Sequence, residues 1–139
     1  MDWQAWAKRA ERALDMAERG DWQGLFAPDA MFGDPQTPST KDLRAVARQT
    51  RTIFPDWRQE ITSIRGGERW AVFEWIGRGT FHMPGTPGDG TPVTIHGATI
   101  VEVNAQGLVT SWRDYLDRKE PEEQILRAAE RSQHAKDRP

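Results

Sequence analysis

Two kinds of hydrophobic spacing divide the chain. Up to about residue 55, apolar residues recur every three or four positions, which is typical of amphipathic helices. From Trp57 onward apolar and polar residues alternate, which predicts β-strands. Helices followed by an antiparallel sheet are the order of an α+β protein, so we expect this fold class.

The helical part is predicted to hold three helices. The first begins near Trp3 and ends at Gly20, because glycine commonly follows a helix. Asp21 can cap a short second helix, Trp22 to Phe26, before a turn at Ala27-Pro28-Asp29. The apolar stripe of the first helix contains Trp3, Trp6, Ala10, Ala13, Leu14 and Ala17.

A short strand and a third helix follow. Ala30 to Pro35 is predicted as a strand that the proline breaks. Ser39-Thr40-Lys41-Asp42 fits a helix-capping pattern and begins a helix that continues up to Pro55. Its apolar stripe contains Leu43, Val46, Ala47, Thr50 and Ile53.

The second half is predicted to form a strongly twisted sheet and a closing helix. Turns are expected at Gly66-Gly67 and at Asn104-Ala105-Gln106-Gly107. We expect one domain over residues 1–131 and a flexible tail over residues 132–139. One strand is predicted to begin at Trp57, and three more are predicted over Trp70 to Phe81, Val93 to Val103 and Leu108 to Leu116. A helix is predicted from Glu122 to Glu130.

The last predicted strand contains a carboxylate in an unusual place. Trp112 and Asp114 share one face of this strand, and Arg113 and Tyr115 share the other. If the Trp112 face is buried, Asp114 lies in an apolar interior, which is costly unless the group is hydrogen-bonded or takes part in chemistry. The structural alternative is a carboxylate satisfied by the Trp112 indole, a backbone amide or Arg113.

Composition narrows the function classes. The 139 residues carry a net charge of -2 without a basic block, so we expect no nucleic-acid partner. The chain has no cysteine, no apolar run of membrane-spanning length and no signal-peptide pattern. We therefore expect a cytoplasmic protein without a membrane partner. Seven tryptophans can line a cavity as well as fill a core.

The run Ser111-Trp112-Arg113-Asp114-Tyr115 resembles the end of limonene-epoxide hydrolases and SnoaL-like polyketide cyclases. These belong to the nuclear-transport-factor-2-like, or cystatin-like, superfamily. The resemblance implies a cone-shaped barrel in which N-terminal helices pack on a strongly curved, mainly antiparallel sheet. It also implies that Asp114 reaches into the cone as a general acid or base.

Asp34 is the second candidate catalytic residue. Its Asp34-Pro35 setting resembles the stretch where ketosteroid isomerases carry their catalytic base, although Asp before Pro is also an ordinary turn former. If Asp34 and Asp114 face one apolar cavity, repulsion and desolvation raise the pKa of at least one of them. Such a pair can move a proton without a cofactor, and we expect none.

The histidines are weaker candidates. His82 lies in a predicted loop at the mouth of the cone, where it is either a third catalytic residue or simply solvated. His96 shares a face with Ala98 and Ile100, which directs it toward a possible subunit interface. Three histidines without carboxylates at ligand spacing do not predict a metal site.

The resemblance to epoxide hydrolases is incomplete. That family needs two aspartates and an arginine, and the positions of its arginine and second aspartate are Trp75 and Gly77 in this chain. The tyrosine and asparagine that hold the water in that family correspond to Phe32 and Asp34. Only Asp114 remains of the set. Trp75 and Gly77 instead indicate an apolar cavity with room for a planar or polycyclic ligand.

These observations favour an enzyme that transfers protons on an apolar carbonyl compound, as a cofactor-independent isomerase, cyclase or lyase. The alternatives are a non-catalytic ligand-binding protein of the same fold and a divergent epoxide hydrolase. We expect a small apolar or polycyclic ligand and a homodimer formed through the outer face of the sheet. The expected ligand-binding residues are Phe32, Phe73, Trp75, Gly77, Thr99 and Trp112.

Overall fold

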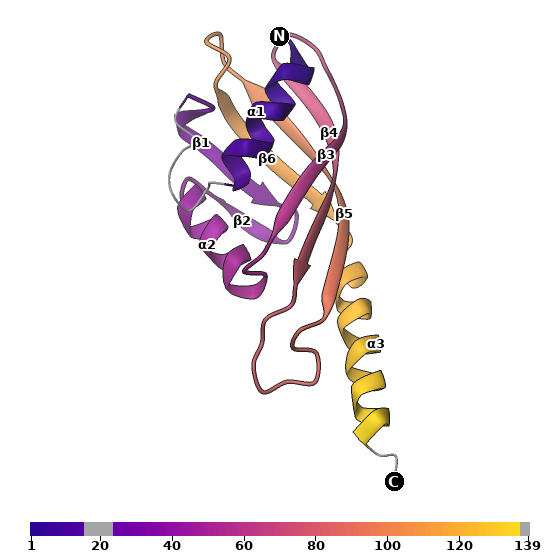
Figure 1. Cartoon of the computed structure of the whole chain (residues 1–139). Coiled ribbons are helices and arrows are strands. Elements are labelled where there is room, and N and C mark those ends of the chain that lie inside the picture. The colour runs from indigo at the N-terminus through magenta and orange to yellow at the C-terminus, as the bar shows by residue number, and fades with distance from the viewer. Residues whose placement is uncertain (16–23, 137–139) are drawn as a thin grey trace.

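A computed structural model describes residues 1–15 and 24–136, and within them three helices and six strands (Figure 1). The strands form one sheet in the order β2-β1-β6-β5-β4-β3. All neighbouring strands are antiparallel except β1 and β6, which are parallel. The elements are α1 (Trp3–Asp15), β1 (Phe26–Asp34), β2 (Thr37–Thr40), α2 (Leu43–Ile53), β3 (Arg58–Gly66), β4 (Trp70–Thr80), β5 (Pro92–Val103), β6 (Val109–Leu116) and α3 (Lys119–Lys136).

The α+β prediction is confirmed, and so is the mainly antiparallel sheet. The long strands β4, β5 and β6 begin and end within one residue of their predicted bounds. The turn at Gly66-Gly67 also forms, and the Gly67 N–H donates to the carbonyl of Trp70. The alternation of apolar and polar residues therefore located the sheet well, because one face of each long strand is buried.

Aromatic side chains form the centre of the core. Helix α1 lies across one face of the sheet (Figure 1) and buries Trp3 and Trp6 there. The Trp6 ring packs against Phe73 of β4 and Trp112 of β6, with ring centroids 5.9 and 6.3 Å away. The predicted stripe of α1 is confirmed from Trp3 to Leu14, and the residues from 16 to Gly20 lie outside the described part of the chain.

The chain between α1 and α2 differs from the prediction. Trp22 lies outside the described residues, but Phe26 begins β1 instead of ending a helix, and the predicted turn at Ala27-Pro28-Asp29 is strand. Pro28 is tolerated because the pairing of β1 with β6 is irregular between Phe26 and Met31, so no regular hydrogen bond is lost there.

Strand β2 was not predicted, and it forms a short hairpin with β1 before α2 begins. Asp42, rather than Ser39, caps α2: its Oδ1 accepts a hydrogen bond of 3.0 Å from the N–H of Ala45. This hairpin fixes where α2 begins beside β1.

Helix α3 is longer than predicted. It begins at Lys119 and continues to Lys136, so residues 132–136 of the expected tail are helical. None of the described helices is both long and apolar enough to cross a bilayer.

Candidate functional site

Asp114 lies on the core face of β6, as the alternation predicted. It is partly buried beside Trp112, whereas Tyr115 on the opposite face is 42% exposed. In the register of the sheet, Asp114 pairs with Thr99 of β5, and Thr99 pairs with Phe73 of β4. The carboxylate is therefore held in the middle of the sheet, among fully buried side chains.

Two donors hold one oxygen of Asp114. The hydroxyl of Thr99 donates to Oδ1 at 2.6 Å, and the indole N–H of Trp112 donates to the same atom at 2.9 Å. The indole N–H of Trp75 donates in turn to the Thr99 hydroxyl oxygen at 2.9 Å. Because an indole can only donate, Thr99 must use its single proton for Asp114.

The second oxygen, Oδ2, accepts no hydrogen bond from any residue in the described part of the chain. It is also not among the buried polar atoms that lack a partner, so its surface is not fully closed off. With Oδ1 already accepting two hydrogen bonds, a proton on Asp114 belongs on Oδ2. The geometry thus separates an anchoring oxygen from a free one.

Burial raises the pKa of Asp114 above its ordinary value, because desolvation disfavours the charged form. The hydrogen bonds from Thr99 and Trp112 act in the opposite direction, and the negative charge of Asp34 adds to the rise. Desolvation dominates, so the carboxyl holds its proton more tightly than a solvated aspartate does.

Asp34 is the neighbour of Asp114 across the parallel pair β1 and β6. Phe32 pairs with Trp112 and Gly33 pairs with Arg113, so the next positions are Asp34 and Asp114. Adjacent strands are about 4.8 Å apart. The two carboxylates predicted as a pair are therefore brought together.

The surroundings of Asp34 are polar. Its Oδ1 accepts the backbone N–H groups of Gln36 and Thr37 at 2.8 and 2.9 Å, and Oδ2 lies 3.2 Å from Nη2 of Arg118. Burial alone would raise the pKa of Asp34, but these hydrogen bonds and the Arg118 charge outweigh it and lower the pKa. The hydrogen bonds to Gln36 and Thr37 agree with the turn interpretation of Asp34, while its role in a catalytic pair stays a prediction.

Aromatic rings surround the buried side of the pair. Phe73, Trp75 and Trp112 are buried, and Phe32 packs against Trp112 with ring centroids 6.5 Å apart. The expected space at Gly77 is occupied: a β-carbon at Gly77 would overlap with the Trp57 ring. Gly77 therefore accommodates a tryptophan of the protein itself, which alternation within single strands could not reveal.

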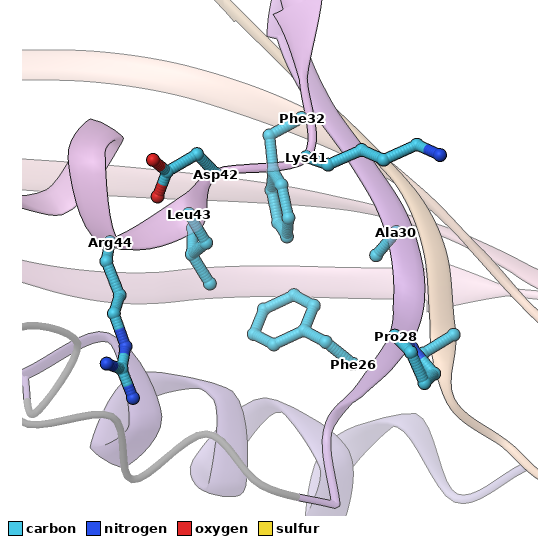
Figure 2. Close-up of a pocket in the computed structure, with 9 residues that line it drawn as sticks. Phe26, Pro28, Ala30, Phe32, Lys41, Asp42, Leu43 and Arg44 are labelled. Carbon is cyan, nitrogen blue, oxygen red and sulfur yellow. The ribbon is translucent and has the colours of Figure 1, made fainter.

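A pocket of about 310 Å³ lies between β1 and the beginning of α2 (Figure 2). Of the expected ligand-binding residues, Phe32 alone lines it among those the structure describes. Figure 2 shows Phe26, Phe32 and Leu43 turned toward one another, with Arg44 beside them. The full lining consists of Phe26, Ala27, Pro28, Ala30, Phe32, Lys41, Asp42, Leu43 and Arg44.

His82 is not brought together with Asp114. It follows the end of β4, where Thr80 pairs with Pro92, and its Nδ1 lies 3.9 Å from Asp89 Oδ1. From Pro92 to Thr99, β5 advances by seven residues, or roughly 20 Å. His82 is exposed, which agrees with the solvated interpretation.

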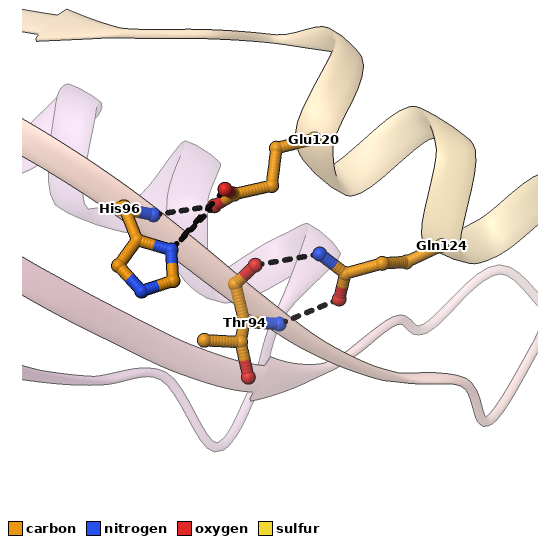
Figure 3. A network of polar contacts seen from close by, with 4 residues as sticks. All are labelled: Thr94, His96, Glu120 and Gln124. Carbon is orange, nitrogen blue, oxygen red and sulfur yellow. Dashed lines mark hydrogen bonds and ion pairs between the residues drawn. The ribbon is translucent and has the colours of Figure 1, made fainter.

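His96 points away from the core, as predicted, and contacts α3 (Figure 3). Glu120 accepts the backbone N–H of His96 and lies 3.1 Å from its Nδ1. One helical turn later, the Gln124 amide exchanges hydrogen bonds of 2.9 and 2.8 Å with the backbone N–H and carbonyl of Thr94. We call Thr94, His96, Glu120 and Gln124 the β5–α3 clamp.

Among the described residues, no three histidine or acidic side chains are grouped closely enough to hold a metal ion. The sequence did not reveal Arg118 as the partner of Asp34, because 84 positions separate them. The capping position of Asp117 before α3 indicates that a helix begins there, but not where its arginine neighbour points.

Comparison with known proteins identifies a family and a fold. Residues 7–112 match the family model described as a SnoaL-like domain, which ends two residues before Asp114. No curated protein sequence matches the chain. The solved structures described below are less than 25% identical to the chain, so their likeness concerns the fold.

Three of these structures illustrate the range of proteins that share the fold. IdmH of Streptomyces antibioticus, a candidate polyketide cyclase, has 19% identity and a TM-score of 0.76, with 91% of this chain and 99% of that chain covered. A protein of Catenulispora acidiphila with a ketosteroid isomerase-like fold, in complex with trimethylamine, has 18% identity, a TM-score of 0.72 and coverage of 87% and 92%. An epoxide hydrolase of M. tuberculosis, described as LEH-like, has 18% identity, a TM-score of 0.62 and coverage of 90% and 92%.

Proposed function

Because the chain belongs to the family of SnoaL-like domains, we propose that it is a cofactor-independent enzyme in which Asp114 moves a proton on an apolar carbonyl compound. The observation that carries this proposal is the difference in hydrogen bonding between the two oxygens of Asp114. Oδ1 is anchored by Thr99 and Trp112, while Oδ2 is left without a partner in the described part of the chain.

The proposed reaction begins with the ionised form of Asp114. Oδ2 takes the proton from the carbon next to a carbonyl group, and the electron pair of that C–H bond moves to the carbonyl oxygen to form an enolate. Where a C=C bond is conjugated with the enolate, return of the proton to the far carbon of that bond shifts the double bond and gives an isomer. Attack of the enolate on a second carbonyl instead closes a ring, and loss of water can follow.

The neighbouring carboxylate supports this assignment. Asp34 has a lowered pKa and Asp114 a raised pKa, so the two groups carry different protonation states over a range of pH. Two acids whose surroundings push their pKa values apart are typical of acid–base sites. Asp34 therefore stays ionised and raises the proton affinity of Asp114.

Epoxide hydrolysis has less support. Trp75 stands where that family carries an arginine, and its indole N–H is already bonded to Thr99. Gly77 stands where the second aspartate would be, and Trp57 covers it. These two positions therefore lack the arginine and the aspartate that orient the water and protonate the epoxide oxygen in that family, and a loss of such groups commonly costs orders of magnitude in rate. We expect no appreciable diol formation from simple terpene epoxides.

Proton exchange can test the proposal before the natural substrate is identified. β-Tetralone is an apolar bicyclic ketone whose α-protons exchange with deuterium oxide, and NMR follows their disappearance. We expect the wild-type protein to accelerate this exchange and Asp114→Asn to lower the acceleration by about 10²-fold or more. Asp29→Asn, at an exposed position of β1, is the matched control and should exchange at the wild-type rate.

Two outcomes would contradict the proposal. Equal acceleration by Asp114→Asn and the wild-type protein would remove Asp114 from the reaction. A wild-type protein that binds the ketone but leaves its exchange rate unchanged would favour the alternative of a non-catalytic ligand-binding protein.

A further inference from the structure

The pocket between β1 and α2 is a second place where a small molecule can bind. It is separate from the carboxylate pair, because neither Asp34 nor Asp114 lines it. Its volume of about 310 Å³ is at the lower end of the range usual for small-molecule sites. The rings of Phe26 and Phe32 and the side chain of Leu43 converge on its centre (Figure 2), which offers an apolar surface to a planar ring system.

The rim of this pocket is positively charged. Lys41 and Arg44 contribute two cations, and Asp42 contributes one carboxylate that is occupied in capping α2. Arg44 makes no ion pair or hydrogen bond with any other residue that the structure describes. In Figure 2 the Arg44 side chain lies on one side of the three apolar side chains, and Lys41 extends away on the other side.

A guanidinium that lines an apolar pocket and has no partner among the described residues matches a ligand with an apolar body and one carboxylate. Arginine can bind a carboxylate through two parallel hydrogen bonds, which a neutral ligand cannot use. The helix dipole of α2 also favours negative charge at this end of the helix. A ligand without the anionic group would keep the ring contacts but lose the pairing with Arg44.

We propose that the pocket between β1 and α2 binds an aromatic or polycyclic carboxylic acid, with its rings on Phe26, Phe32 and Leu43 and its carboxylate on Arg44. This inference goes beyond the proton-transfer function, since it needs no reaction at Asp114. It assigns the protein a ligand class with a defined polarity: apolar at one end and anionic at the other.

Calorimetric titration with naphthoate and with its neutral methyl ester tests the proposal. We expect naphthoate to bind the wild-type protein more tightly than the ester does. Arg44→Gln should weaken naphthoate binding by about tenfold, because a charge-assisted hydrogen bond is lost, and should leave the ester nearly unaffected. Arg65→Gln is the matched control: it makes the same charge change at an exposed site on β3, at the opposite edge of the sheet.

Leu43→Ala separates the apolar contribution from the charge. This variant should weaken naphthoate and its ester alike, and circular dichroism should verify that it is folded. Asp114→Asn should bind naphthoate as the wild-type protein does, so failure of the proton-exchange assay would leave this inference standing.

Several results would overturn the inference. These are equal affinity of the wild-type protein for the acid and the ester, an equal loss with Arg65→Gln and Arg44→Gln, and ester binding that Leu43→Ala does not change. A loss of naphthoate affinity in Asp114→Asn as large as that in Arg44→Gln would also show that the pocket is not a separate site.

Discussion

At the scale of single residues, the surroundings of the two Asp114 oxygens decide what the carboxyl group can do. Oδ1 needs its two donors, Thr99 and Trp112, to offset the cost of burial. An asparagine at this position keeps an oxygen for both donors but cannot titrate. Asp114→Asn therefore changes the chemistry of the site while preserving its hydrogen bonds.

Thr99 is expected to position Asp114 and to satisfy Trp75. Thr99→Val removes the hydroxyl, so the buried indole N–H of Trp75 loses its acceptor, and we expect a loss of about 1–3 kcal/mol in the free energy of unfolding. The same change removes a hydrogen bond that lowers the pKa of Asp114, so this pKa should rise further. Chemical denaturation and NMR titration measure the two effects.

Thr99→Ser retains the hydroxyl and is the control for this substitution. It should keep the wild-type pKa of Asp114 and most of the wild-type stability. If Thr99→Val and Thr99→Ser gave the same Asp114 pKa, the hydrogen bond would have no part in tuning the group.

Asp34 is expected to stabilise the fold at neutral pH. Its pKa is lowered in the native state, so its contribution is present above the unfolded pKa of about 3.9 and is lost as pH falls through the native pKa. Asp34→Asn should cost about 1 kcal/mol at neutral pH, because the pairing with Arg118 is lost. Denaturation at several pH values should show this difference shrinking in acid; a constant difference would contradict the linkage.

The residue-level prediction from sequence was good for Asp114 and incomplete for its neighbours. Strict alternation in β6 was enough to place Asp114 with Trp112 on the buried face. The space next to Gly77 is filled by the ring of Trp57, which lies just before β3. The pairing of β3 with β4 brings the two residues together. Contacts of this kind depend on the register between strands, which the local pattern does not specify.

At the scale of elements, the β5–α3 clamp replaces missing strand pairing. Strand β6 ends at Leu116, which pairs with Gly97, so the residues of β5 before Gly97 have no strand partner on that side among the described residues. Side chains four positions apart on a helix rise by about 6 Å. This nearly matches two residues of a strand, about 6.6 Å, so Glu120 and Gln124 reach His96 and Thr94 together.

Gln124→Ala should loosen α3 from the edge of β5. The substitution leaves the N–H and carbonyl of Thr94 without their protein partner, at a partly exposed site where we expect a cost of about 1 kcal/mol. Amide hydrogen exchange at Thr94 and His96 should become faster. Gln133→Ala, at an exposed position of the same helix, is the control and should leave both amides protected.

Faster exchange in both variants would mean that helix content, and not the clamp, protects this edge.

The clamp also explains why α3 was predicted too short. Its hydrophobic pattern is weak, and none of its residues is fully buried. Polar contacts to β5 and the packing of Ile125 against the core hold it, and polar contacts leave no periodic signal in the sequence.

In β1 the sequence contains a clear local signal, but the prediction made from it was wrong. Ala27-Pro28-Asp29 has the composition of a turn, yet these residues continue β1 because a local irregularity in the pairing with β6 accepts the proline. Turn propensity is a local preference, and the pairing with β6, more than 70 positions later, overrides it. Strand β2 is short and exposed, so it carried no alternation to detect.

At the scale of the whole molecule, the outer face of the sheet carries exposed apolar side chains. Trp70, Val72 and Tyr115 are 51%, 37% and 42% exposed on β4 and β6. Val72 pairs with Ile100 of β5, so these side chains extend across neighbouring strands. We propose that a second copy of the chain covers this face, because adjoining apolar side chains on an open sheet face are typical of interfaces.

Light scattering at micromolar concentration should give the mass of a dimer. Val72→Lys places a charge on this face and should shift the protein toward the monomer, whereas Met83→Lys, at an exposed loop position, should not. A wild-type monomer would reject the proposal, and so would equal dissociation by the two substitutions.

The proposed proton transfer depends most on Asp114 being a buried acid whose pKa is raised. Because the native pKa exceeds the unfolded value, stability falls as pH rises between the two, and Asp114→Asn should be as stable as the wild-type protein or more stable near neutral pH. NMR titration of the aspartate carboxyl carbons, assigned with Asp114→Asn and Asp34→Asn, measures the claim directly. We predict a midpoint for Asp114 above the model-peptide value of about 3.9 and one for Asp34 below it. An Asp114 midpoint at or below that value, together with a large loss of stability in Asp114→Asn, would contradict the assignment of Asp114 as a buried acid with a raised pKa.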